Sequence, residues 1–147
     1  MKRKAAGWPV ILVADDDQDI LDLVRLRLTR VGYELLLAHD GREALELARE
    51  HVPDLAILDV SMPELDGYAV AKLLKRNPET AAIPVIMLTA RAQVKEVEEG
   101  FAAGAHDYIT KPFSPADLQA RTAEVLARFA AAAEEPSTKP LRLAAGQ

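Results

Sequence analysis

Residues 10–20 read VILVADDDQDI, so a run of apolar residues leads directly into three consecutive aspartates. The run is continuous rather than alternating, which is typical of a strand that is covered on both faces of a sheet. Asp15 and Asp16 therefore follow the carboxyl end of a predicted buried strand, and Asp17 opens the segment after it. Negative charge concentrated at the end of a buried strand requires something to offset it.

Apolar runs of this kind recur along the chain. The five runs cover residues 9–14, 33–38, 54–59, 83–88 and 107–110. The segment after the first run and the segment after the last run carry apolar residues three and four positions apart, which is helical spacing. Strict alternation of strand and helix predicts an α/β fold, namely a doubly wound five-stranded parallel sheet with right-handed crossovers and helices on both faces.

Capping residues agree with these helix boundaries. Asp17 and Asp40 stand where the first two helices should begin, and an aspartate side chain can accept hydrogen bonds from the free N–H groups there. Gly32 stands where the first helix should end. Ser114 followed by Pro115 predicts the start of the last helix.

Composition excludes several classes of protein. The chain has 147 residues, half of them apolar, no cysteine and a formal net charge of −5. This length suits one domain with tails, and the lack of cysteine excludes disulfides and thiolate metal sites. No apolar run reaches the roughly 18 residues that a membrane span needs. We expect a cytoplasmic protein without a membrane segment and without direct nucleic-acid contact, since duplex binding usually depends on a basic stripe.

The residues at the strand ends form a set with a common chemistry. In an open parallel sheet, ligands bind beyond the carboxyl ends of the strands. Asp15 and Asp16 follow the first run, Asp59 ends the third, Thr89 follows the fourth, and Lys111 follows the fifth. The sequence therefore predicts three carboxylates, one hydroxyl and one ammonium at a single edge.

These groups together suit a phosphoryl group and a hard cation. Neighbouring carboxylates repel each other, and Mg²⁺ held by one or two carboxylates compensates their charge while keeping positions open for phosphate oxygens. The ammonium and the hydroxyl can bind the same anion. A carboxylate can itself be the nucleophile and form an aspartyl phosphate.

Four motifs in this order resemble the receiver domain of two-component response regulators. They are ILVADDD (11–17), LAILDVSMPELDG (55–67), PVIMLTAR (84–91) and GFAAGAHDYITKPF (100–113). The resemblance implies the flavodoxin-like strand order 2-1-3-4-5. We expect an N-terminal tail (1–8), a receiver domain (9–133) and a flexible tail or linker (134–147), where helical periodicity is lost and Pro, Ser and Gly appear.

The resemblance assigns a role to each residue of the predicted site. Asp59 would accept a phosphoryl group from a histidine kinase or phosphotransfer protein. Asp16, Asp59 and the backbone carbonyl of Ser61 would bind Mg²⁺, and Asp15 would act mostly through a bound water. Lys111 would contact the phosphoryl oxygens.

A second set of residues would report the reaction to a partner. Thr89 would turn toward the phosphate and Tyr108 would follow into the vacated space, which changes the face formed by the fourth helix, the fifth strand and the fifth helix. The family commonly holds the peptide bond between Lys111 and Pro112 cis. Ser61 and Arg91 occupy the positions that tune the lifetime of the phosphorylated form, and we expect neither to speed hydrolysis.

The sequence predicts a phosphorylation switch rather than an enzyme with a product of its own. We expect a stand-alone receiver that acts through a downstream protein target, and the alternative is the receiver part of a larger transcriptional regulator. Asp107 and Arg121 resemble parts of a dimerisation face, which allows a homodimer, although His106 replaces the acid usual there.

Two competing functions follow from the same residues. A Mg²⁺-dependent phosphohydrolase could use an aspartate of the first strand as its nucleophile, because residues 15–17 contain an Asp-x-Asp pattern. Such an enzyme would need a cap domain, for which 147 residues leave no room. A degenerate receiver acting as a scaffold is disfavoured, because every predicted site position holds a competent residue.

Overall fold

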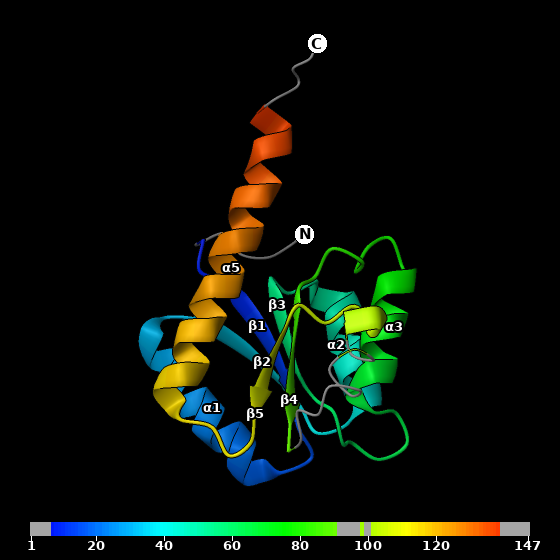
Figure 1. Cartoon of the computed structure of the whole chain (residues 1–147), viewed down its shortest axis with the longest axis vertical. Coiled ribbons are helices and arrows are strands. Elements are labelled where there is room, and N and C mark those ends of the chain that lie inside the picture. The colour runs from blue at the N-terminus through cyan, green and yellow to red at the C-terminus, as the bar shows by residue number, and fades with distance from the viewer. Residues whose placement is uncertain (1–6, 91–97, 99–100, 139–147) are drawn as a thin grey trace.

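A computed structural model of the chain describes residues 7–90, 98 and 101–138. Strands and helices alternate through this region (Figure 1). In chain order, the elements are β1 (Val10–Ala14), α1 (Gln18–Val31), β2 (Glu34–Ala38), α2 (Gly41–His51), β3 (Leu55–Asp59), α3 (Gly67–Arg76), β4 (Val85–Thr89), β5 (Asp107–Thr110) and α5 (Pro115–Thr138).

The five strands form one parallel sheet in the order β2-β1-β3-β4-β5. This confirms the predicted α/β class and the predicted order 2-1-3-4-5. The fourth helix of the alternating pattern falls mostly on residues outside the described part of the chain, with residues 101–103 as a described helical turn before β5. The order places β1, β3 and β4 inside the sheet, where their carboxyl ends lie next to one another.

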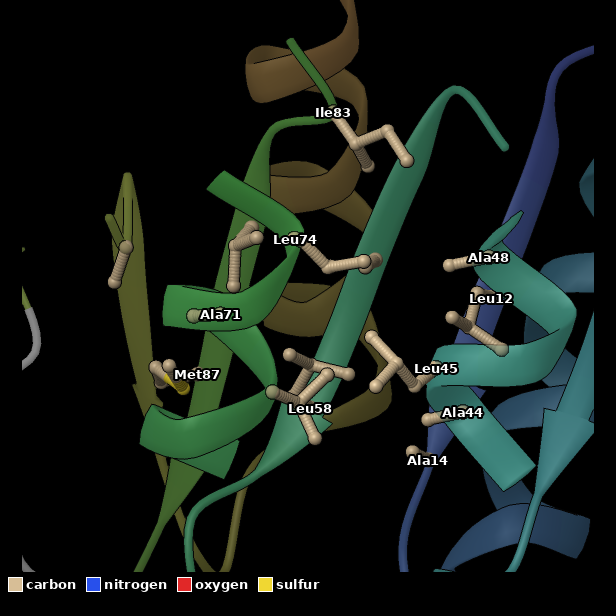
Figure 2. Packing of buried hydrophobic residues seen from close by; sticks show 14 of the residues in the cluster. Leu12, Ala14, Ala44, Leu45, Ala48, Leu58, Ala71, Leu74, Ile83 and Met87 are labelled. Carbon is tan, nitrogen blue, oxygen red and sulfur yellow. The ribbon is translucent and has the colours of Figure 1, made fainter. Parts of the chain in front are cut away.

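Helices cover the sheet on both faces, with α1 and α5 on one side and α2 and α3 on the other (Figure 1). Leu12, Leu58 and Met87 point from three strands toward α2 and α3 (Figure 2). The side chains on those helices that meet them are Ala44, Leu45, Ala48, Ala71 and Leu74. Each large apolar side chain buried in this way contributes about 1.5–3 kcal/mol. β1, β3 and β4 are buried along their whole length, as continuous apolar runs predict.

The predicted helix caps are confirmed. The Asp17 side chain accepts a hydrogen bond from Asp19 N at 2.9 Å, and Asp40 accepts one from Glu43 N at 2.8 Å. Gly32 ends α1 with a φ of 115°, a left-handed conformation that favours glycine. Ser114 Oγ accepts from Asp117 N at 2.9 Å, and α5 then begins at Pro115.

The last helix continues past residue 133, where we placed the end of the receiver domain. α5 runs to Thr138 and extends beyond the amino-terminal ends of the strands (Figure 1). The alanine-rich sequence of this part has high helix propensity, which outweighs its weak amphipathic pattern. The domain boundary itself stays a prediction. No helix in the described ranges has the length and the apolar character that crossing a membrane requires.

His106 fastens the beginning of β5 to the beginning of β4. Its backbone N–H donates to Val85 O at 2.7 Å, and its ring Nδ1 accepts from Val85 N at 3.0 Å. The imidazole also packs edge-on against Phe129 of α5, with 4.7 Å between ring centroids. Burial lowers the pKa of His106, and the positive charges of Lys75 and Arg128 lower it further. Because Nδ1 accepts the hydrogen bond from Val85 N, this bond requires a neutral imidazole.

This contact predicts a stability that falls in acid. As pH drops through about 6.5, the unfolded chain takes up a proton at His106 before the folded protein does, so the unfolding free energy decreases. His106→Asn keeps an acceptor but cannot titrate, and it should weaken this decrease. Urea unfolding at about pH 7.5 and pH 5.5 measures the effect. His51→Asn, at the surface, is the control and should keep the wild-type pH dependence; an unchanged dependence in His106→Asn would contradict the prediction.

Candidate functional site

The predicted site residues meet at the carboxyl edge of the sheet. Asp15 follows β1, Asp59 ends β3, Thr89 ends β4 and Lys111 follows β5. One carboxylate oxygen from each of Asp15, Asp16 and Asp59 lies within 4.8 Å of the others. The rule for strand ends therefore located the three acids correctly.

Lys111 bridges two of the three carboxylates. Its Nζ lies 2.9 Å from Asp15 Oδ2 and 3.2 Å from Asp59 Oδ1. Asp15 is fully buried and Asp59 is 3% exposed, whereas Asp16 is exposed. When all are ionised, three carboxylates and one ammonium leave two negative charges without compensation, in a place where water screens them poorly. The site is therefore short of two positive charges.

These residues fit a hard divalent cation. The contact between Asp15 Oδ2 and Lys111 has the distance of an ion pair, but no donor meets this buried oxygen with hydrogen-bond geometry among the described residues. A buried carboxylate oxygen that lacks such a donor is costly, and a water molecule bound to a cation would supply the donor. The oxygen-only donor set and the charge both match Mg²⁺.

The electrostatics of Asp59 and Lys111 follow from this crowding. Burial raises the pKa of Asp59, and the neighbouring Asp15 charge raises it further, while Lys111 and the Ser61 N–H act in the opposite direction. Burial alone would lower the pKa of Lys111, but the contacts with Asp15 and Asp59 outweigh it, and the pKa is raised. Lys111 thus stays charged, whereas the ionised form of Asp59 is destabilised in the folded protein.

The loop after β3 fixes the backbone of Asp59. Ser61 N donates to Asp59 Oδ1 at 3.4 Å, and Gly67 N donates to Val60 O at 3.2 Å. A Cβ added to Gly67 would lie 2.5 Å from Asp59 O, so only glycine lets α3 begin this close to the strand. Asp66 caps the helix by accepting from Ala69 N at 2.9 Å.

Thr89 and Lys111 are joined through the backbone. Lys111 N donates to Thr89 O at 2.7 Å, which extends the ladder between β4 and β5 by one step. Thr89 is 5% exposed at the end of β4, next to the strand that carries Asp59. The peptide bond between Lys111 and Pro112 is cis, as the resemblance implied.

Tyr108 is buried at the middle of β5, on the face covered by α3. Its hydroxyl donates to Tyr68 Oη at 3.3 Å, and its ring packs edge-on against Phe101 with centroids 5.4 Å apart. Tyr68 was not predicted from the sequence. Its only signal there was its place directly after Asp66 and Gly67, which does not reveal a partner 40 residues away.

The face that resembled a dimerisation surface is held by contacts within the chain. Arg121 Nη1 lies 2.9 Å from Asp107 Oδ1 and donates to Tyr108 O at 3.0 Å. Arg121 Nε lies 3.3 Å from Asp117 Oδ2. These contacts tie α5 to β5. Arg91, which we named for the lifetime of the phosphorylated form, lies outside the described residues.

Comparison with known proteins gives one consistent result. The model of the response regulator receiver domain matches residues 11–123. The DNA-binding dual master transcriptional regulator RpaA of Synechocystis sp. is 44% identical over 120 residues, which are 82% of this chain and 50% of RpaA. The chemotaxis protein CheY4 of Vibrio cholerae has a crystal structure with a TM-score of 0.78 and 34% identity, covering 81% of this chain and 99% of that chain.

A further solved structure bears on the metal. The receiver domain of a sensor histidine kinase from Pseudomonas aeruginosa PAO1 has a TM-score of 0.73 and 30% identity to this chain. The match covers 84% of this chain and 98% of that chain, and the structure holds a magnesium ion coordinated in its active-site cleft. The curated relatives are longer proteins, and this chain spans about half of their length.

The strained charge of Asp59 predicts a gain in stability when it is removed. Because burial and the Asp15 charge raise the folded pKa of Asp59, Asp59→Asn should increase the unfolding free energy at pH 7 in the absence of divalent cations. The gain should shrink as pH falls and the wild-type carboxyl becomes protonated. Urea unfolding with a chelator present measures it. Asp22→Asn on α1 is the control, and an equal gain there, or a loss at Asp59, would refute the prediction.

Proposed function

The chain belongs to the response regulator receiver family, and on this basis we propose that it is switched by Mg²⁺-dependent transfer of a phosphoryl group to Asp59. As a receiver domain it is a signalling component of a two-component system. One observation carries the assignment to Asp59: this carboxylate ends β3 inside the acidic cluster and contacts the Lys111 ammonium at 3.2 Å.

The donor would be a phosphohistidine of a histidine kinase or phosphotransfer protein. A carboxylate oxygen of Asp59 attacks the phosphorus, and the P–N bond breaks. The imidazole leaves as a neutral ring if its second nitrogen carries a proton, and the product is an aspartyl phosphate. The Lys111 ammonium already contacts Asp15 and Asp59. It can also contact the oxygens of the transferred phosphoryl group and stabilise their negative charge.

Mg²⁺ would be held by Asp16, Asp59 and the Ser61 carbonyl, with Asp15 acting through water. When bound, it would supply the two positive charges that the site lacks and neutralise phosphoryl oxygens. Asp16 suits this role because it is exposed at the edge of the cluster, while buried Asp15 already pairs with Lys111.

Thr89 and Tyr108 would carry the signal away from Asp59. Their place on β4 and β5 supports this role. A backbone hydrogen bond joins Lys111 to Thr89, and the Arg121 side chain joins α5 to the Tyr108 carbonyl. A downstream protein would bind the face that contains β5 and α5, and the same face could form a homodimer. The contact of Arg121 with Asp107 would then have to be exchanged for one between copies.

The rest of the proposal concerns the wider protein. We propose residues 9–133 as the receiver domain. We predicted a stand-alone receiver, with the receiver part of a larger transcriptional regulator as the alternative, and the greater length of the relatives supports the alternative. DNA binding is stated for RpaA, and for this chain the prediction stays that it makes no direct nucleic-acid contact. Cytoplasmic localisation likewise stays a prediction.

The first prediction of this proposal is the site of labelling. Wild-type protein incubated with acetyl phosphate and Mg²⁺ should gain one phosphoryl group, and Asp59→Asn should gain none, as measured by intact mass. Borohydride trapping of the acyl phosphate followed by peptide mapping should mark Asp59. A label on the peptide of residues 10–20 would instead support the phosphohydrolase with a first-strand nucleophile.

The second prediction concerns the metal. Mg²⁺ should stabilise the wild-type protein, because a ligand that binds only the folded state raises the unfolding free energy. Asp16→Asn should weaken Mg²⁺ binding by at least roughly tenfold, a loss that even outer-shell changes often cause. Thermal unfolding across a Mg²⁺ titration measures this. Asp22→Asn removes the same charge one turn into α1 and should bind Mg²⁺ normally; equal weakening in both variants would count against a metal role for Asp16.

A further inference from the structure

The hydroxyl groups of Tyr68 and Tyr108 join α3 to β5. Tyr108 Oη donates to Tyr68 Oη at 3.3 Å, across 40 residues of sequence. Tyr108 is 9% exposed, and Tyr68 is half-buried against the same core cluster. Phe101 contacts the Tyr108 ring edge-on, with 66° between the ring planes. The rings alone would pack without hydroxyls, so the hydroxyl contact adds direction to an otherwise apolar contact.

The residue before Tyr68 packs against the backbone of Asp59. This residue is Gly67, whose Cα sits so close that an added Cβ would lie 2.5 Å from Asp59 O. Gly67 N in turn donates to Val60 O, directly after Asp59. In the first turn of α3, Gly67 therefore lies against the proposed acceptor Asp59, and the next residue, Tyr68, contacts the proposed switch residue Tyr108.

We propose that Tyr68 is a positioning residue of the switch, whose hydroxyl holds Tyr108 in its buried position. The proposal rests on the proposed function, in which a buried Tyr108 accompanies phosphorylation of Asp59. A group that stabilises the buried Tyr108 must then favour the phosphorylated arrangement, because the two equilibria are linked. Tyr68 does so by accepting one hydrogen bond, in addition to the packing of its ring.

The Tyr68→Phe variant removes this acceptor and keeps the ring. Its affinity for beryllofluoride, a phosphoryl analogue, should fall by about threefold to tenfold in the presence of Mg²⁺, the factor expected for one net hydrogen bond. Titration calorimetry measures this affinity. Tyr33→Phe is the matched control, since Tyr33 packs against the cluster on the opposite face of the sheet and its change should leave the affinity unaltered.

A spectroscopic readout separates positioning from general destabilisation. The chain has three tyrosines, so protein labelled with 3-fluorotyrosine gives few ¹⁹F resonances, and Tyr→Phe variants assign them. The Tyr108 resonance should shift in Tyr68→Phe and stay in place in Tyr33→Phe. Tyr108→Phe combined with Tyr68→Phe should lower the affinity no further than Tyr108→Phe alone, because the proposal has the Tyr68 hydroxyl act on the switch through Tyr108 Oη.

The outcomes distinguish the proposed role of Tyr68 from the proposed function on which it rests. Wild-type protein that binds no beryllofluoride, or binds it equally well after Asp59→Asn, overturns the proposed function. Binding that depends on Asp59 but is unchanged in Tyr68→Phe overturns the role of Tyr68 alone. An unmoved Tyr108 resonance in Tyr68→Phe also overturns it, even if the affinity falls.

Discussion

Repulsion among three carboxylates at the end of a buried sheet is the constraint on which the rest of this structure depends. Asp15 and Asp59 are almost wholly removed from water, and Asp16 borders them. One ammonium, Lys111, cannot neutralise all three. The pKa of Asp59 is raised because burial and the neighbouring Asp15 charge both oppose its ionisation, and Lys111 does not fully compensate them. A site with this charge deficit attracts a divalent cation, and the cation together with Lys111 would then offset the negative charge of a phosphoryl group.

The fold tolerates this repulsion because the buried strands that lead into the acids are rigidly packed. β1, β3 and β4 are fully buried, and apolar clusters on both faces pack against them. Burial of many large side chains supplies far more free energy than a few poorly compensated charges cost. Sites that cost stability are expected where function requires them. The sheet order matters too, since β1 and β3 are neighbours and bring Asp15 and Asp59 together. The long Lys111 side chain reaches both carboxylates from the end of β5, past the intervening strand β4.

The sequence was sufficient for the sheet and for the acids, but not for contacts between distant side chains. Continuous apolar runs reveal buried parallel strands, and the end of each run then places Asp15, Asp59 and Lys111 at one edge by topology alone. The contact between Tyr68 and Tyr108 depends on how α3 packs over β5, which no local pattern encodes. We underestimated the length of α5 because its last turns are helical through the high helix propensity of their residues, and apolar spacing does not mark them.

The start of α3 lies between the proposed acceptor Asp59 and the proposed switch residue Tyr108. Gly67 lets the helix approach the carbonyl of Asp59, and the next residue places a hydroxyl on Tyr108. In the proposed function, a rearrangement of the loop after β3 would therefore reach Tyr108 through the first turn of α3 as well as through Thr89. Two routes from the proposed acceptor Asp59 to the proposed switch residue Tyr108 would make intermediate arrangements costly, because an arrangement that keeps the contacts of one route and breaks those of the other loses stability. Such coupling favours two discrete states over a gradual response.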